Sequence, residues 1–280
     1  MKAGDAGRLV ALAAIWGASF LFTRVVAPAL GPVATADLRM LIGGGALALY
    51  FALTGFDPQY RRFAGQYALI GMLNSGLPFL LYSYAALELS AGMLSVLNAT
   101  SPMWGALMAA LLLGERLSAR RAAGLALGVA GVVLLSRPDS ASGALAIAAG
   151  LGGAFLYGLS GVYLRRWASH VPARGMAVGT QLAAGLLVLP FFVAAPPGAP
   201  PEPHIVANVI ALGLLCSAVA YVLYFRLVAD IGAAGALTVT YLIPAFGVLW
   251  GVLFLGETVS AAMLGGALLV VIGTVFVLRN

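Results

Sequence analysis

Long apolar runs separated by short polar clusters form the pattern along the whole chain. Each run is about 20 residues long, the length that a helix needs to cross about 30 Å of hydrocarbon. The runs lack the period of two residues that is typical of membrane β-barrels. We therefore predict an all-α membrane protein with ten transmembrane helices. The predicted spans are residues 8–27, 33–53, 65–86, 91–113, 120–136, 143–165, 173–194, 205–227, 232–254 and 260–278.

The composition agrees with this pattern. Hydrophobic residues make up 62% of the 280 residues, charged residues make up 9%, and the mean hydropathy is +1.03. A soluble domain of this length needs more charge to cover its surface. The preference for Arg over Lys, together with abundant Ala and Gly, is typical of a GC-rich bacterial genome.

Basic residues divide unequally between the two faces that ten spans create. The face with both termini carries 12 of them and the other carries three, Arg24, Arg39 and Arg137, which sums to the total of 15. An excess of Lys and Arg in short loops marks the cytoplasmic side. We expect a multi-pass protein of a bacterial cytoplasmic (inner) membrane with both termini in the cytoplasm. The first residues also fit a cleaved signal peptide, but their apolar stretch is longer than a typical signal core.

The chain contains an internal repeat. The stretch ATSPMWGALMAALLLGE (99–115) returns as YLIPAFGVLWGVLFLGE (241–257), a shift of 142 positions. The shift aligns Pro102 with Pro244, Gly105 with Gly247, and Glu115 with Glu257. We therefore predict two domains, 1–140 and 141–280, with five helices each.

An odd number of helices in each repeat gives the two halves opposite orientations in the membrane. Such inverted repeats are typical of transporters that work by alternating access. The pattern alone therefore favours a transporter.

Several dispersed motifs resemble a known family. The stretches WGASFLFTR (16–24) and PVATADLRMLIGG (32–44), together with the second half from 215 to 273, are similar to EamA-type repeats of the drug/metabolite transporter (DMT) superfamily. Within it, the chain most resembles the YddG-like aromatic amino-acid exporters. The resemblance implies a single-chain carrier with ten helices that exports small metabolites. The first helix lacks the acidic residue with which small multidrug exporters of the superfamily exchange protons for cationic drugs.

Polar and aromatic side chains recur at helical spacing within the apolar runs. Ser75, Phe79 and Tyr82 share one helix face by their i, i+4, i+7 spacing, and the second half repeats the pattern with Tyr221 and Tyr224. We predict a neutral, aromatic cavity for a solute with a flat apolar part and polar ends. The alternative is that these groups bridge helices or anchor the membrane interface. The candidate substrate-binding residues are Trp16, Ser75, Phe79, Tyr82, Asn98, Tyr157, Gln181, Tyr221, Tyr224 and Tyr241.

The two repeated prolines are candidate hinges. A proline inside a helix removes a backbone hydrogen bond and kinks the helix. Pro102 lies near Gly105, and Pro244 lies near Gly247, at equivalent places in the two halves. The alternative is a fixed kink in each helix.

Five charged residues are candidates for gates or ion pairs. We expect Asp37 to pair with Arg24 or Arg39, because charges inside membranes usually pair. The alternative is that an arginine binds a substrate carboxylate, or that Asp37 carries a coupling proton. Glu115 and Glu257 lie at helix ends, where each can bind arginines or cap the next helix and so latch a gate.

The sequence favours a carrier that exports aromatic or other neutral amino acids and similar small metabolites by alternating access. The alternatives are an exporter of drugs, nucleotide sugars or other metabolites from the same superfamily, or a channel-like or scaffolding membrane protein. We expect no enzyme activity, metal, cofactor or nucleic-acid partner, because no acid–base pair or metal-ligand cluster stands out. A chain that carries both halves needs no second copy, so we expect a monomer in the lipid bilayer.

Overall fold

The structure is a computed structural model that describes residues 3–135 and 141–278. All regular secondary structure in these residues is helical, and nine helical stretches are long and apolar enough to cross a membrane. The chain is therefore an all-α protein of the membrane-spanning type, as predicted. The remaining predicted span, 120–136, corresponds to α7 (Ala119–Leu135), whose 17 residues make it shorter than those nine. The count of ten stays a prediction, and Arg137 lies outside the described residues.

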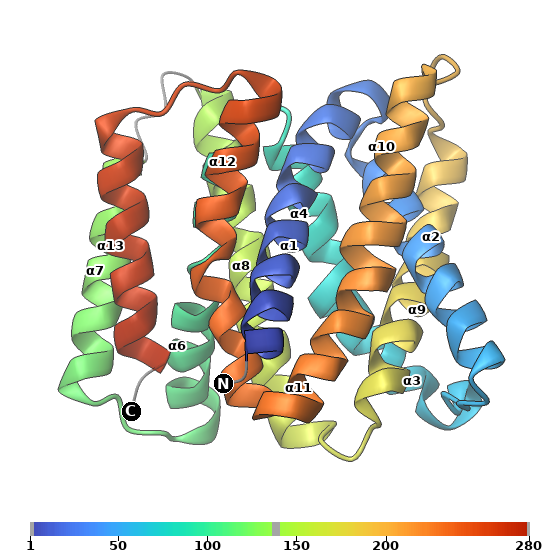
Figure 1. The fold of residues 1–280 in the computed structure, drawn as a ribbon, viewed down its shortest axis with the longest axis horizontal. Coiled ribbons are helices and arrows are strands. Elements are labelled where there is room, and N and C mark those ends of the chain that lie inside the picture. The colour runs from blue at the N-terminus through green and yellow to red at the C-terminus, as the bar shows by residue number, and fades with distance from the viewer. Residues whose placement is uncertain (1–2, 136–140, 279–280) are drawn as a thin grey trace.

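The helices follow the predicted spans closely. The first half forms α1 (Ala3–Leu30), α2 (Pro32–Leu53), α3 (Tyr60–Gly71), the π-helix η1 (Met72–Gly76), α4 (Leu77–Ala85), α5 (Ala91–Asn98), α6 (Ser101–Leu113) and α7. The second half forms α8 (Ala141–Trp167), α9 (Ala173–Ala194), α10 (Pro203–Gly213), the π-helix η2 (Leu214–Val219), α11 (Ala220–Leu237), the 3-10 helix η3 (Thr238–Tyr241), α12 (Ile243–Leu255) and α13 (Ala261–Leu278). The helices stand side by side, with α7 and α13 at one end of the bundle and α2, α9 and α10 at the other (Figure 1).

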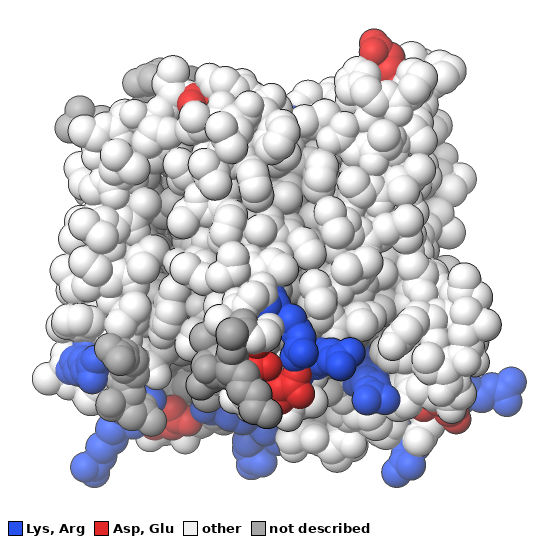
Figure 2. Space-filling model, in the orientation of Figure 1, with Lys and Arg blue, Asp and Glu red and all other residues white. Residues whose placement is uncertain are grey.

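Charge is concentrated at one edge of the bundle. Arginine side chains gather along the lower edge in Figure 2, where α1 begins and α13 ends in the same view of Figure 1. We call this the basic edge. The sides that lie between the two edges in this view carry almost no charge, as expected for a surface in contact with lipid.

Glycines bring α7 and α13 close together. A Cβ atom at Gly124 would lie 2.6 Å from the carbonyl oxygen of Gly273, and one at Gly131 would lie 2.7 Å from that of Gly266. Small residues allow this backbone approach, which supplies packing energy between membrane helices. The shift of 142 positions relates the two contacts, because Gly124 corresponds to Gly266 and Gly131 to Gly273. Exchanging the two halves therefore turns the contact between Gly124 and Gly273 into the contact between Gly266 and Gly131.

A second pair of close contacts is related in the same way. A Cβ atom at Gly17 in α1 would lie 3.0 Å from the backbone nitrogen of Gly247 in α12. A Cβ atom at Gly158 in α8 would lie 2.5 Å from the backbone nitrogen of Gly105 in α6. The helix pairs α1–α12 and α6–α8 are therefore packed through equivalent glycines.

Both repeated prolines lie where a helix restarts. After α5 ends at Asn98, α6 begins at Ser101 with Pro102 in its first turn. After η3, α12 begins at Ile243 with Pro244 in its first turn. The first turn needs no partner for the missing N–H group, so proline fits there without strain. Each proline thus marks a helix interruption, and movement at these places stays a prediction.

Close packing at Gly131 leads to a test. We expect Gly131→Ala to lower the melting temperature in detergent, because its methyl group would press on the backbone of α13 and overpacking costs about 1–3 kcal/mol. The control is Gly45→Ala in α2, where nothing lies within 4 Å of the added Cβ. There alanine should leave the melting temperature unchanged or raise it. Equal melting temperatures for both variants would contradict the packing argument.

Candidate functional site

A cavity of about 590 Å³ lies inside the bundle. Its lining comes from both halves, including α1, α2, η1, α4, α6, α8, η2 and α11. The volume is within the range of sites that bind small molecules. Seven aromatic side chains line it: Trp16, Phe20, Phe79, Tyr82, Tyr157, Tyr221 and Tyr224.

The aromatic rings contact one another around the cavity. The ring of Trp16 lies 5.6 Å from that of Tyr224, and the ring of Tyr82 lies 6.1 Å from that of Tyr157 in a stacked arrangement. Such contacts hold the rings in place around the cavity. The lining also contains the side-chain amides of Asn74 and Asn98.

The structure brings seven of the ten predicted substrate-binding residues to this cavity. These seven are Trp16, Phe79, Tyr82, Asn98, Tyr157, Tyr221 and Tyr224. The other three, Ser75, Gln181 and Tyr241, are not part of the lining. The role of each lining residue in binding stays a prediction.

The π-helix η1 explains why Asn74 takes the place predicted for Ser75. In an α-helix the residue four positions before Phe79 shares its face, which is Ser75. A π-helix, with i→i+5 hydrogen bonds, has more residues in each turn than an α-helix, and here Asn74 lines the cavity. Ser75 is fully buried, and its hydroxyl has no hydrogen-bond partner. A second polar residue within an apolar run was the signal for Asn74 in the sequence.

Gln181 is part of α9, its side chain lies next to α2, and it is outside the cavity lining. It is fully buried, and neither its amide nitrogen nor its amide oxygen has a hydrogen-bond partner. The oxygen would lie 3.2 Å from a Cβ atom at Gly43 in α2. The small residue at position 43 therefore makes room for the amide.

The ion pair predicted for Asp37 is not formed. Asp37 is fully buried, and neither carboxylate oxygen has a hydrogen-bond partner. Arg24 instead donates to the carbonyl oxygen of Ala86 at 2.8 Å. Arg39 is two positions from Asp37 on α2, and residues at this spacing do not face each other on a helix. The prediction rested on the general tendency of charges inside membranes to pair and was wrong, because Arg24 binds a backbone carbonyl and Arg39 lines the cavity.

Arg39 lies in the cavity. Its guanidinium group covers the ring of Phe79, with 3.8 Å from its central carbon to the ring centroid. Its Nε atom donates a long hydrogen bond of 3.4 Å to the hydroxyl of Ser217. The sequence placed Arg39 near the face with fewer charges, whereas the structure places it among the aromatic lining residues.

The two repeated glutamates have different partners. Glu115 forms ion pairs with Arg165 at 2.7 Å and with Arg121 at 3.6 Å, as the prediction of arginine binding requires. Glu257 caps a helix, but this helix is α5 of the other half. Its carboxylate accepts from the backbone nitrogen atoms of Ala91 at 2.7 Å and Gly92 at 3.3 Å.

The predicted cap of the next helix by Glu257 is therefore wrong. Ser260 already occupies that place, because its hydroxyl accepts from the backbone nitrogen of Met263 in the first turn of α13 at 3.1 Å. At α5 the hydroxyl of Ser90 accepts from Met93 in the same way, at 3.1 Å. Glu257 accepts from the N–H groups of Ala91 and Gly92, which precede Met93. Residues of both halves therefore supply the hydrogen-bond acceptors at the start of α5.

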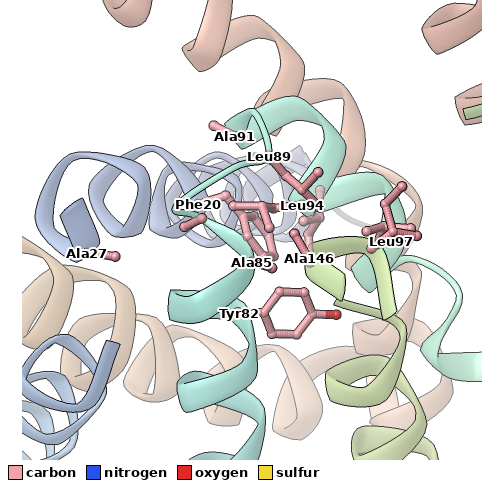
Figure 3. Packing of buried hydrophobic residues seen from close by; sticks show 12 residues of the cluster. Phe20, Ala27, Tyr82, Ala85, Leu89, Ala91, Leu94, Leu97 and Ala146 are labelled. Carbon is pink, nitrogen blue, oxygen red and sulfur yellow. The ribbon is translucent and has the colours of Figure 1, made fainter. Parts of the chain in front are cut away.

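A buried apolar cluster adjoins the cavity and shares Phe20 and Tyr82 with its lining. The cluster, which includes Phe20, Ala85, Leu94 and Ala146, packs above the ring of Tyr82 (Figure 3). Phe20 contacts Tyr82 edge-to-face, with 5.7 Å between the ring centroids. We call this group of residues the apolar plug.

At one end the cavity reaches the basic edge. Its lining there includes Glu115, Arg121 and Arg165, which follow α6, begin α7 and end α8. The side chain of Arg165 is 54% exposed, so the cavity meets solvent at this place. Within the described residues no group of three His, Cys, Asp or Glu side chains lies close enough to hold a metal ion.

Comparison with protein families defines the class. A model described as "EamA-like transporter family" matches the chain twice, at residues 8–137 and 144–279. The chain therefore belongs to the EamA-like transporter family and is a membrane transporter.

Individual relatives extend over nearly the whole chain. The chain is 26% identical to a probable terminal-alkyne amino-acid exporter of Streptantibioticus cattleyicolor, over 93% of this chain and 89% of that one. It is 28% identical to the uncharacterized inner membrane transporter YedA of Escherichia coli (strain K12), over 91% of this chain and 84% of that one. One crystal structure superposes with a TM-score of 0.70 at 21% identity, covering 99% of this chain and 96% of that one, and it supports the fold alone.

The cap by Glu257 leads to a second test. We expect Glu257→Ala to raise the hydrogen-exchange rate of the amides at Ala91 and Gly92 by roughly three- to thirtyfold, because loss of a helix cap costs about 0.5–2 kcal/mol. The control is Glu88→Ala, which removes an exposed acid near the same helix start. Unchanged exchange in Glu257→Ala, measured by mass spectrometry, would show that the carboxylate does not hold this end of α5.

Proposed function

We propose that this transporter exports aromatic or other neutral amino acids, and similar small metabolites, by alternating access. The observation that carries this proposal is a cavity of about 590 Å³ whose aromatic part combines seven aromatic side chains and two asparagine amides with Arg39. Aromatic walls suit an apolar side chain, and the polar groups suit the two charged ends of an amino acid. The similarity to an amino-acid exporter agrees with this assignment.

We propose ten spans in two inverted repeats, 1–140 and 141–280. Three observations support this arrangement. The family model matches once in each half. The π-helices η1 and η2 begin at positions 72 and 214, a shift of 142. Nearly the same shift relates the two glycine contacts between α7 and α13 to each other. It also relates the glycine contact of α1 with α12 to that of α8 with α6.

The basic edge is proposed as the cytoplasmic side of a bacterial inner membrane, with both termini there. The excess of arginine at this edge favours this orientation. The cavity meets solvent at this edge, and we infer that the apolar plug closes it at the other, so this conformation is inward-open. For export, it is the state that takes up substrate.

The gate follows from the two glutamates. In the inward-open state Glu257 holds the start of α5 and so keeps the outer end shut. The equivalent Glu115 pairs with Arg165 and Arg121 at the open end. In the outward-open state we expect the cap of Glu257 to break while the two halves exchange roles. The helix interruptions at Pro102 and Pro244, with Gly105 and Gly247 one turn later, are the proposed hinges.

The charges of the lining weigh against cationic drugs and nucleotide sugars. Its acidic residue, Glu115, already has two arginine partners at the mouth. Within the aromatic part Arg39 is the basic residue, and one arginine is little for a diphosphate. An amino acid, with one carboxylate and one apolar group, matches this lining better.

A transport assay tests the cavity. With purified protein in liposomes, we expect saturable uptake of labelled phenylalanine, and Trp16→Ala should raise the half-saturation concentration about tenfold, since ring contacts contribute about 0.5–1.5 kcal/mol beyond burial. The control is Trp167→Ala at the end of α8, where the ring is 47% exposed. Flux that does not saturate would indicate a channel. Equal effects of both substitutions would exclude this cavity as the transport site.

An accessibility assay tests the gate. In a Cys216→Ser background, Ser101→Cys places a thiol in the cavity lining. A membrane-impermeant thiol reagent should label it from the cytoplasmic side of oriented vesicles. Adding Glu257→Ala should increase labelling from the opposite side several-fold, because the outer end is then held less firmly, whereas adding Glu88→Ala should not. Labelling from the opposite side that is equal in all three proteins would contradict the gate.

A further inference from the structure

Arg39 carries a positive charge within the span of α2. It is the eighth residue of this helix, so it lies about 10 Å from the helix start at a rise of about 1.5 Å per residue. A charge at such depth is costly unless it has a partner or lies in a water-filled cavity. Within the described part of the chain, no acidic side chain forms an ion pair with Arg39.

Two contacts fix the guanidinium group but leave its outer end available. The central guanidinium carbon lies over the ring of Phe79, and Ser217 accepts from Nε. The two terminal nitrogen atoms, Nη1 and Nη2, donate to none of the described residues. Arg39 is half-buried and lines the cavity, so these two donors are accessible from it.

A planar guanidinium group with two free donors fits one ligand group best. A carboxylate can accept from Nη1 and Nη2 at the same time and neutralises the charge. We propose that Arg39 is the anchor for the substrate carboxylate and that the transporter recognises arylalkyl carboxylates, with or without an amino group. This proposal rests on the function proposed above and narrows its substrate class.

The amino group of the ligand has no comparable partner. The acidic side chain in the lining, Glu115, is at the mouth and is paired with Arg165 and Arg121. Around Arg39 the polar groups are amides and hydroxyls, which accept from an ammonium group but do not neutralise it. The carboxylate is therefore required, whereas the amino group contributes little to affinity.

The repeat supplies a further argument. A shift of 142 positions places Gln181 at the equivalent of Arg39, so one half carries the charge and the other carries a neutral amide. Gln181 is buried outside the lining, and Arg39 is in it. The cavity therefore has a carboxylate site on one side, and a bound ligand has a defined orientation.

Binding to purified protein in detergent tests the proposal with four ligands of similar shape. These are phenylalanine, 3-phenylpropionate without the amino group, phenylalaninamide without the carboxylate, and phenethylamine. We expect the first two to bind within about threefold of each other. The last two should bind on the order of 10- to 100-fold more weakly, because hydrogen bonds to a charged group contribute about 1.5–3 kcal/mol.

Variants test the anchor itself. Arg39→Gln should weaken the binding of phenylalanine on the order of 10- to 100-fold and leave the binding of phenethylamine unchanged. Arg39→Lys should weaken the binding of phenylalanine less. The control is Arg24→Gln, whose arginine contacts the backbone of Ala86 and is not in the cavity. It should bind phenylalanine as the unmodified protein does. The ligand series with unmodified protein decides the matter if Arg39→Gln does not fold.

The outcomes separate this proposal from the one on which it rests. If phenylalanine binds and is transported, but equally well with Arg39→Gln, the anchor is wrong and amino-acid export stands. Tighter binding of phenethylamine than of 3-phenylpropionate also overturns the anchor. If none of the four ligands binds or is transported, the proposal of amino-acid export is wrong, and the proposal that Arg39 binds the substrate carboxylate is wrong as well.

Discussion

Backbone groups inside a bilayer must find hydrogen-bond partners within the protein, and this constraint decides where the helices of this chain can be irregular. Irregular backbone is tolerated where it is buried in protein or lines a cavity. The π-helices η1 and η2, and the restarts before Pro102 and Pro244, all contribute residues to the cavity or adjoin it. The irregular segments and the site therefore coincide, whereas α7 and α13 contribute to the lining only near their ends, through Arg121, Val277 and Leu278.

The architecture follows from the sequence because it depends on features with a fixed period. Apolar runs of constant length and glycines at a constant shift could be recognised without coordinates, and nine of the predicted spans correspond to helices long enough to cross a membrane. The repeated Gly114 and Gly256 also have positive φ values of 70° and 64°, as helix ends at glycine require. These features are local, so neighbouring residues determine them.

The contacts between halves could not be predicted in this way. Glu257 caps α5 because two segments 166 positions apart meet, and the sequence does not encode that meeting in any local pattern. Asn74 was missed because a single π-turn changes which residue faces the cavity. Asp37 was expected to pair with Arg24 or Arg39, because charges inside membranes usually pair, yet Arg39 lies in the cavity and Asp37 is buried without a partner. The site depends on such details, whereas the fold does not.

The repeat determines the arrangement of the helices, and the proposed binding of a carboxylate depends on a position where the two halves differ, Arg39. In the proposed alternating-access cycle, two similar halves would make the inward-open and outward-open states similar in energy, because most burial is common to both. Small terms then decide the populations: a cap such as that of Glu257 contributes about 1 kcal/mol, which changes a ratio of states about fivefold. Arg39 has no charged equivalent in the second half, so a ligand bound to it contacts the two halves unequally. A ligand can shift such an equilibrium only by its difference in affinity for the two states, and this asymmetry supplies one.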